Sequence, residues 1–168
     1  MANEGDETLI RISLAQQRLQ LLKAGQVLRE YAVSTAANGP GELRDSGCTP
    51  RGWHEICARI GAGCAPGTVF LGRRPTGERY SDALAHRHPE RDWILTRILW
   101  LRGLEPGRNR HGRVDTQRRY IYLHGCPDST PLGVPRSHGC VRMRNADIVE
   151  LFEQVKPGTR VWIQEGPF

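Results

Sequence analysis

The triplet His-Gly-Cys occurs twice in this chain of 168 residues, at positions 124–126 and again at positions 138–140. A histidine beside a cysteine can take the thiol proton and leave a thiolate nucleophile. The same two side chains are also common zinc ligands. The sequence therefore offers two kinds of chemistry, and they require different geometry.

The zinc interpretation uses both pairs of side chains, which are His124, Cys126, His138 and Cys140. Structural zinc sites usually place two to four residues between paired ligands, whereas a single glycine separates each pair here. Side chains two positions apart on a strand have Cβ atoms roughly 6–7 Å apart, which one ion bridges only with distortion. We therefore expect no metal and no cofactor, and a non-catalytic zinc or anion-binding module remains an alternative.

The nucleophile interpretation favours Cys140 over Cys126. Cys140 follows Ser137, His138 and Gly139, and the glycine allows a tight turn that leaves backbone N–H groups free to hold an oxyanion. Lowering the pKa of a thiol by two units requires about 2.7 kcal/mol, which an imidazolium and a nearby helix end can supply. We expect a lowered thiol pKa, with His138 supporting the loop rather than acting as the base.

The general base expected for this nucleophile is His124, at the end of the strictly alternating segment 119–124. Alternation places Tyr120, Tyr122 and His124 on one face of a strand. The other face would belong to the core. A rigid strand can hold the imidazole so that it points at Cys140.

The elements that must position these residues are mostly strands. Alternating or apolar runs bounded by turn residues predict strands at 8–14, 18–21, 26–34, 53–60, 69–71, 93–101, 119–124 and 159–163. The first three form an antiparallel meander with a turn at 23–25. One clear helix is predicted at 145–155, with Asn145 as its N-cap. Polar loops at 36–52, 73–91 and 103–115 complete a mostly-β, single domain spanning 8–168, after a disordered segment at 1–7.

Composition sets the expected surroundings of this domain. The net charge is +6, and only two of the 24 basic residues are lysines, so arginines could bind anionic ligands. No basic run with interleaved aromatics points to nucleic acid. Five cysteines, an odd number, suit a reducing compartment better than a disulfide framework. Because we find no signal peptide and no apolar span, we expect a cytoplasmic protein that binds no membrane.

Segments 120–124 and 137–143 strongly resemble the signature of the YkuD domain, the L,D-transpeptidase family of bacterial cell-wall enzymes. Upstream, residues 49–56 resemble that family's Thr-Pro segment, and the hairpin at 17–35 resembles its early strands. The resemblance covers roughly residues 8–163. It implies a β-sandwich-like fold.

The resemblance also implies a reaction. Cys140 would attack the meso-diaminopimelate carbonyl of a peptidoglycan tetrapeptide stem, release the terminal D-Ala and form a thioester. His124 would be the general base, oriented by the backbone carbonyl of Gly125. Gly139 would belong to the oxyanion hole.

The substrate-binding residues that the resemblance implies surround this centre. They are Ser137, His138 and Arg142, to which we add Tyr122 and Arg119. Arg142, with Arg119 as the second choice, could bind the carboxylate of the departing D-Ala. Cys126 departs from the family's pattern and would place a second thiol near the reactive one. It could be inert, or it could form a disulfide with Cys140 under oxidation. The loop at 125–136 also looks short for the family.

Two outcomes are open for the thioester. In the cytosol it meets water rather than neighbouring stems, so we expect an L,D-carboxypeptidase that trims tetrapeptides to tripeptides during muropeptide recycling. The alternative is an L,D-transpeptidase that forms cross-links or exchanges D-amino acids. The oligomeric state is not predicted.

Overall fold

The computed structural model describes residues 7–168 and shows a mostly-β fold with one main helix, as predicted. Most of the predicted disordered segment, residues 1–6, lies outside the described residues. The strands are β1 (Thr8–Ser13), β2 (Arg18–Lys23), β3 (Gln26–Ala32), β4 (Gly52–Ile60), β5 (Thr68–Leu71), β6 (Arg74–Arg79), β7 (Ile94–Gly103), β8 (Tyr122–Gly125), β9 (Val141–Met143) and β10 (Arg160–Gln164). The helices are α1 (Asp82–Arg87) and α2 (Asn145–Gln154), with a short 3-10 turn at Gly112–Val114.

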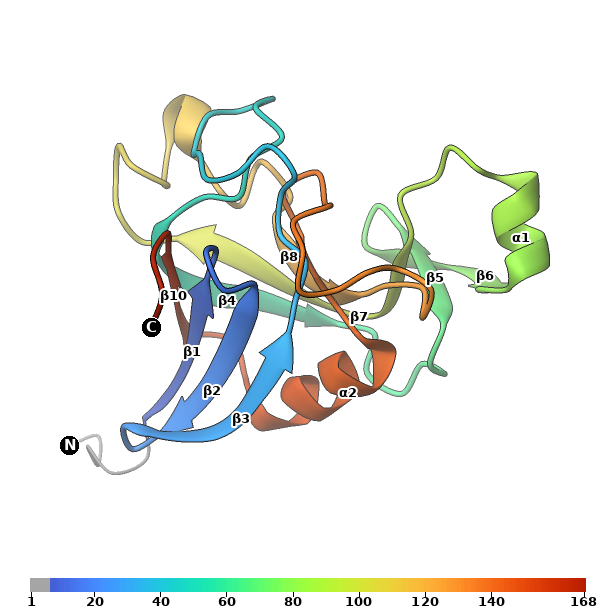
Figure 1. Cartoon of the computed structure of the whole chain (residues 1–168), viewed down its shortest axis with the longest axis horizontal. Coiled ribbons are helices and arrows are strands. Elements are labelled where there is room, and N and C mark those ends of the chain that lie inside the picture. Colours follow the sequence, from blue (N-terminus) through green and yellow to red (C-terminus); the bar gives the residue numbers. More distant parts are fainter. Residues whose placement is uncertain (1–6) are drawn as a thin grey trace.

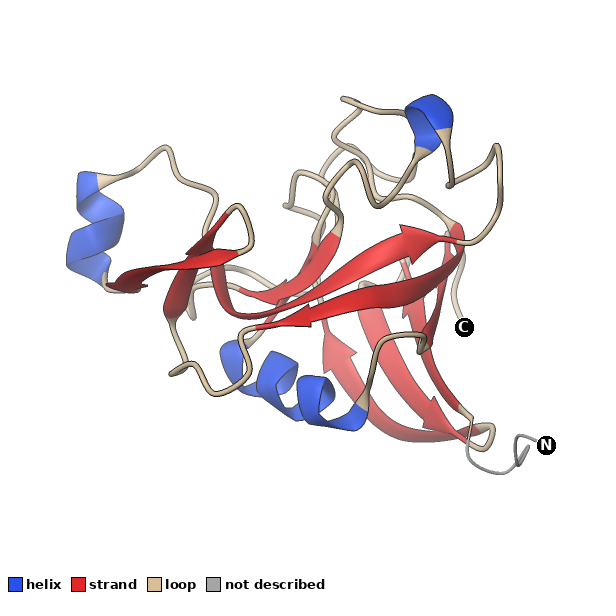
Figure 2. Cartoon of the chain, turned by 180° about the vertical axis from the view of Figure 1, so that it is seen from behind, coloured by secondary structure: helices blue, strands red, loops and turns tan. Residues whose placement is uncertain are grey.

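The ten strands form one mixed sheet in the order β3-β2-β1-β10-β4-β7-β5-β6, and β8 and β9 continue from β7. Two pairs are parallel, β1 with β10 and β8 with β9. The sheet curves around α2, so that β1–β3 and β7–β8 contribute to one core with the helix (Figures 1 and 2). The β8–β9 pair is therefore supported from behind by the main core.

The predicted antiparallel meander is confirmed. Strands β1, β2 and β3 pair antiparallel, with Thr8 opposite Lys23 in the first pair. Ala24 and Gly25 connect β2 to β3 with φ angles of 53° and 77°. Positive φ at both positions is typical of the tight hairpin turn whose twist matches that of the strands.

The apolar stripe of α2 is as predicted, but its N-cap is not. Ile148, Leu151 and Phe152 are buried on one side of the helix. Arg144 occupies the cap position, and Asn145 is the first helical residue. The Asn145 side chain bonds across the structure instead, because its amide donates to the Cys126 carbonyl at 2.9 Å.

The polar excursion predicted at 73–91 forms a small lobe that extends away from the rest of the sheet (Figure 1). It contains the unexpected strand β6 and the helix α1, whose N-cap Ser81 accepts a hydrogen bond from the Leu84 N–H at 3.0 Å. Leu84 packs with Val69 and Leu95 in a separate apolar cluster. The chain returns from this lobe into β7, close to the β8–β9 pair.

The alternation predicted for 119–124 holds only in part. Tyr120 has a φ of 56° and lies in a turn, so β8 begins at Tyr122. The left-handed backbone breaks the period of two that relates Tyr120 to His124. Tyr120 is consequently exposed, whereas Tyr122 and His124 are buried. Among the described helices, none has the length and apolar character to span a membrane.

Candidate active site

Strands β8 and β9 bring the two His-Gly-Cys segments together in parallel. His124 lies opposite Arg142, so the two side chains occupy one face. Continuing the same register places Cys140 beside Tyr122, which agrees with a 3.3 Å hydrogen bond from the Tyr122 N–H to the Cys140 sulfur. The opposite face of the pair is apolar and belongs to the core, through Ile121, Leu123, Val141 and Met143. One face of a short strand pair therefore carries the candidate nucleophile, base and cation.

The Cys140 thiol is held by backbone groups. It accepts from the Tyr122 N–H and donates to the Tyr120 carbonyl, both at 3.3 Å. Burial raises its pKa to about 12, against the opposing effects of the Tyr122 hydrogen bond and the Arg142 charge. This direction is opposite to the lowered pKa expected from the sequence, because desolvation of the thiolate outweighs the nearby positive charges.

The His124 imidazole is buried and held in one orientation. Its Nδ1 donates to the Gly125 carbonyl at 2.6 Å, which leaves Nε2 as the unprotonated nitrogen. Burial lowers the pKa of His124, although the nearby Asp92 carboxylate acts to raise it. Both Cys140 and His124 are therefore neutral near pH 7.

The turn before Cys140 is fixed by hydroxyl groups. Ser137 Oγ donates to the Cys140 carbonyl at 2.5 Å and accepts from the Gly139 N–H at 3.2 Å. Thr49 Oγ1 donates to the Gly139 carbonyl at 2.8 Å. Gly139 has a φ of 132°, and a Cβ there would lie 3.2 Å from the Cys48 carbonyl oxygen. The N–H predicted for the oxyanion hole is thus bonded to Ser137 in this structure.

Asp92 is a charged residue of the site that the sequence did not single out. Its Oδ1 lies 3.0 Å from Nη2 of Arg142, and its Oδ2 lies 3.3 Å from Nδ1 of His138. Burial acts to raise the pKa of Asp92, but the charges of His124 and Arg142 hold it below its ordinary value. One aspartate just before a strand belongs to no motif, so no sequence signal would have identified it.

Arg119 lies on another side of Cys140, in a different environment. Its guanidinium donates to the Cys48 carbonyl at 2.7 Å and to the Gly41 carbonyl and Ser46 Oγ at 3.3 Å. All three acceptors are neutral, and burial lowers the pKa of Arg119. A cavity of about 410 Å³ opens here, lined by Arg44, Asp45, Gly47, Arg118, Arg119, Tyr120, Ile121 and His138. The charged side chains around this cavity are mainly basic, and it reaches the Cys140 thiol through Tyr120, a lining residue whose carbonyl accepts from that thiol.

Cys126 is separated from Cys140, contrary to the expectation of a neighbouring thiol. Its N–H and Sγ–H both donate to the Met143 carbonyl, at 3.1 and 3.3 Å. Cys126 therefore lies just beyond the Gly125–Met143 pair, at the far end of the β8–β9 pairing from Tyr122. Cys126 lies four positions after Tyr122, the residue beside Cys140, which corresponds to about 13 Å along a strand. A disulfide requires Cα atoms within about 7 Å. The residues of the zinc alternative do not converge, and within 7–168 no cluster of three metal-binding side chains is found.

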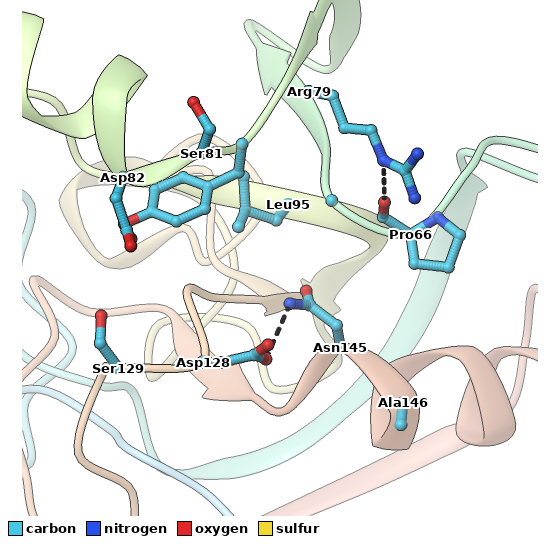
Figure 3. Close-up of a pocket in the computed structure, with 11 residues that line it drawn as sticks. Pro66, Arg79, Ser81, Asp82, Leu95, Asp128, Ser129, Asn145 and Ala146 are labelled. Atoms are coloured by element: carbon cyan, nitrogen blue, oxygen red, sulfur yellow. Dashed lines mark hydrogen bonds between the residues drawn. The ribbon is translucent and has the colours of Figure 1, made fainter.

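A larger cavity lies elsewhere, between the lobe and the start of α2 (Figure 3). It measures about 840 Å³ and is lined by Pro66, Gly67, Arg79, Tyr80, Ser81, Asp82, Leu95, Asp128, Ser129, Asn145 and Ala146. Asn145 donates to Asp128 Oδ1 at 3.4 Å across its floor. Neither Cys140 nor His124 lines this cavity, so it is separate from the candidate active site.

Several known proteins are similar to this chain in sequence or in structure. A family model described as the L,D-transpeptidase catalytic domain, YkuD, matches residues 7–163. The probable L,D-transpeptidase YbiS of Escherichia coli K12 is 47% identical over 49 residues, which are 29% of this chain and 16% of that protein. The probable L,D-transpeptidase ErfK/SrfK of Salmonella typhimurium is 43% identical over 49 residues, again 29% of this chain and 16% of that protein. These matches therefore cover less than a fifth of either relative.

Solved structures share the fold at low sequence identity. The LD transpeptidase LdtMt1, in complex with imipenem, superposes with a TM-score of 0.58 at 19% identity, over 95% of this chain and 60% of that one. An L,D-transpeptidase from Xylanimonas cellulosilytica superposes with a TM-score of 0.55 at 21% identity, over 95% of this chain and 61% of that one. The curved sheet with its single main helix is thus a known architecture.

Proposed function

Because the chain belongs to the L,D-transpeptidase catalytic domain (YkuD) family, we propose that it is a cysteine acyltransferase acting on peptidoglycan stem peptides. The observation that supports this most directly is the shared face of β8 and β9. His124 lies on β8, Cys140 immediately precedes β9 and bonds to the Tyr122 N–H, and the Gly125 carbonyl holds the imidazole with its basic Nε2 free. That arrangement is suited to a thiol that loses its proton as it attacks.

In the proposed first step, the Cys140 sulfur attacks the meso-diaminopimelate carbonyl of a tetrapeptide stem. Nε2 of His124 takes the thiol proton, so the neutral pair becomes an imidazolium and a tetrahedral oxyanion. The bond to the D-Ala nitrogen then breaks, and the imidazolium gives its proton to that nitrogen. The products are free D-Ala and a thioester on Cys140.

Backbone donors near the sulfur would stabilise the oxyanion. The Gly139 N–H is one of them, provided that its hydrogen bond to Ser137 Oγ yields to the substrate. An oxyanion binds such a donor more strongly than a neutral hydroxyl does. Ser137 would then be free to contact the stem.

The remaining predicted contacts lie around this centre. Tyr122 and Arg142 share the face of the nucleophile, and His138 and Arg119 line the basic cavity beside it. A stem peptide carries several carboxylates, which the guanidinium groups can bind. These substrate contacts are proposals, as are the catalytic assignments.

For the second step we propose water as the acceptor, which makes the protein an L,D-carboxypeptidase that converts tetrapeptides to tripeptides. Hydrolysis requires one stem site beside the thiol, and the basic cavity is a suitable candidate. We further propose that this hydrolysis takes place in the cytosol, during muropeptide recycling. Transpeptidation is the second candidate, supported by the names of the relatives that share 49-residue segments with this chain.

Product analysis separates these functions. We would incubate the purified chain with a disaccharide-linked or UDP-linked tetrapeptide and follow the products by mass spectrometry. Tripeptide and free D-Ala indicate hydrolysis, whereas dimers or exchanged stems as main products indicate transpeptidation. If no D-Ala is released and no acyl adduct forms on Cys140, the acyltransferase proposal is wrong. Cys140→Ala is the control for background cleavage.

A further inference from the structure

Asp92 occupies a distinctive position, because it pairs with Arg142, which lies opposite His124 in the β8–β9 register. It follows the lobe, immediately before β7, and its two oxygens contact Arg142 at 3.0 Å and His138 at 3.3 Å. The Arg142 side chain is only 14% exposed, whereas that of Asp92 is 40% exposed. Asp92 therefore covers Arg142 while remaining open to a molecule that enters the site.

The location of the leaving group follows from the role of His124. The imidazolium must reach the nitrogen of the departing amino acid, so that amino acid lies beside His124. By microscopic reversibility, an amine that attacks the thioester occupies the same place and gives its proton to the same nitrogen. Arg142 lies opposite His124 in the β8–β9 register, and Asp92 pairs with Arg142 at 3.0 Å. They therefore border the place where an amine acceptor must sit.

An amino-acid acceptor has an amine and a carboxylate, and the charges of Asp92 and Arg142 would act on both groups. Its amine must be unprotonated to attack, and a carboxylate beside it favours the ammonium form. Each unit of increase in the amine pKa lowers the fraction of unprotonated, reactive amine about tenfold near pH 7. The acceptor's carboxylate would bind Arg142, but Asp92 already pairs with that guanidinium. Water carries neither charge and is not disfavoured in this way.

We propose that Asp92 is a specificity-determining residue that directs the acyl group of the Cys140 thioester to water rather than to amino-acid amines. This inference rests on the proposed acyltransferase function and deepens it by assigning the choice of acceptor to one side chain. The carboxylate of the departing D-Ala meets Asp92 as well, so the effect on the acceptor is measured as a ratio of the two products. That ratio depends on the fate of the thioester and not on the rate of the first step, which releases D-Ala.

The two outcomes differ only in the bond that forms. In hydrolysis, the carbon–sulfur bond breaks, a carbon–oxygen bond to water forms, and one water proton returns to the Cys140 sulfur through His124. In aminolysis, the same carbon–sulfur bond breaks, a carbon–nitrogen bond forms, and an amine proton returns to sulfur by the same route. No oxidant, reductant or cofactor enters either step.

The test measures the ratio of exchange product to tripeptide when tetrapeptide is incubated with excess D-methionine at pH 7. We expect Asp92→Asn to raise this ratio about tenfold over the wild type. Glu90→Gln is the matched control, because it removes one negative charge two residues away on an exposed side chain that pairs with His88. That control should leave the ratio unchanged. Asp92→Glu, which keeps the carboxylate, should return the ratio toward the wild-type value.

Hydroxylamine distinguishes this role from a merely structural one. It is neutral at pH 7 and lacks a carboxylate, so Asp92→Asn should alter its capture of the thioester much less than that of D-methionine. An unchanged D-methionine ratio in Asp92→Asn would overturn the inference, as would an equal rise for both amines. If the wild type releases no D-Ala and forms no adduct on Cys140, the proposed function itself fails.

Discussion

The two His-Gly-Cys segments have the same sequence but different positions relative to the β8–β9 register. The first contributes its histidine to the reacting face, since His124 lies beside Arg142. The second contributes its cysteine, since Cys140 lies beside Tyr122. Cys126 follows the end of β8 and bonds to the Met143 carbonyl. Identical triplets thus supply different parts of one site, because the parallel pairing offsets them.

The comparison also shows that thiol acidity does not distinguish the two cysteines. Burial raises the pKa of Cys126 to about 11 and that of Cys140 to about 12. The proposed nucleophile is therefore not the more acidic of the two thiols. What separates them is the neighbourhood, because Cys140 shares its face with His124 and with groups able to bind substrate.

The largest expected difference between the segments is in activity. Cys140→Ala removes the nucleophile and should lower the rate of D-Ala release by a factor on the order of 10⁴ or more. Cys126→Ala should keep the rate within about twofold, because Cys126 follows β8 and lies about 13 Å along the chain from the residue beside Cys140. Both rates are measured on the tetrapeptide substrate. The reverse result would exchange the roles of the two triplets.

The next difference concerns alkylation of the thiols. Because the pKa of Cys140 is raised to about 12, the thiol is neutral near pH 7 and ionises as the pH increases. Its reaction with iodoacetamide should rise about tenfold per pH unit, or about 10³-fold between pH 7 and pH 10. Peptide mapping reports Cys140 and Cys126 separately. A plateau below pH 8 at Cys140 would indicate a preformed thiolate–imidazolium pair instead.

The glycine of the first triplet should affect stability. A Cβ at Gly125 would overlap the Asn145 side-chain oxygen and the Leu95 carbonyl, and the backbone of β7 cannot easily move away. Gly125→Ala should lower the free energy of unfolding by about 1–3 kcal/mol, measured by urea denaturation. Gly166→Ala is the control, because nothing lies within 4 Å of a Cβ there. Equal effects of the two substitutions would show that Gly125 is not constrained by packing.

The smallest expected effect concerns Cys126 as a packing residue. Cys126→Ala removes a buried sulfur and its hydrogen bond to the Met143 carbonyl, so we expect a loss of about 1 kcal/mol in unfolding free energy. Mild oxidation of the wild type should produce no Cys126–Cys140 disulfide. Mass spectrometry of the folded, oxidised protein tests this. A Cys126–Cys140 linkage would contradict the separation of the two cysteines in the structure.

Local patterns predicted most of the strands but not their irregularities. The meander and the apolar stripe of α2 depend on side-chain periodicity, which neighbouring residues determine. Tyr120 departs from its predicted face because a left-handed backbone interrupts the alternation. Asn145 is not a cap because its side chain bonds to the Cys126 carbonyl, which is distant in sequence. Such bonds cannot be read from a window of residues.

The candidate site divides in the same way. The sequence by itself determined the identity of the nucleophile and base candidates, through residue types and a motif, and it determined the strand that carries His124. Only the tertiary structure showed that Asp92 pairs with Arg142, that burial raises rather than lowers the pKa of Cys140, and that Cys126 lies apart. The physical reason is that desolvation and ion pairing depend on which distant segments meet, whereas residue type and periodicity are local properties of the chain.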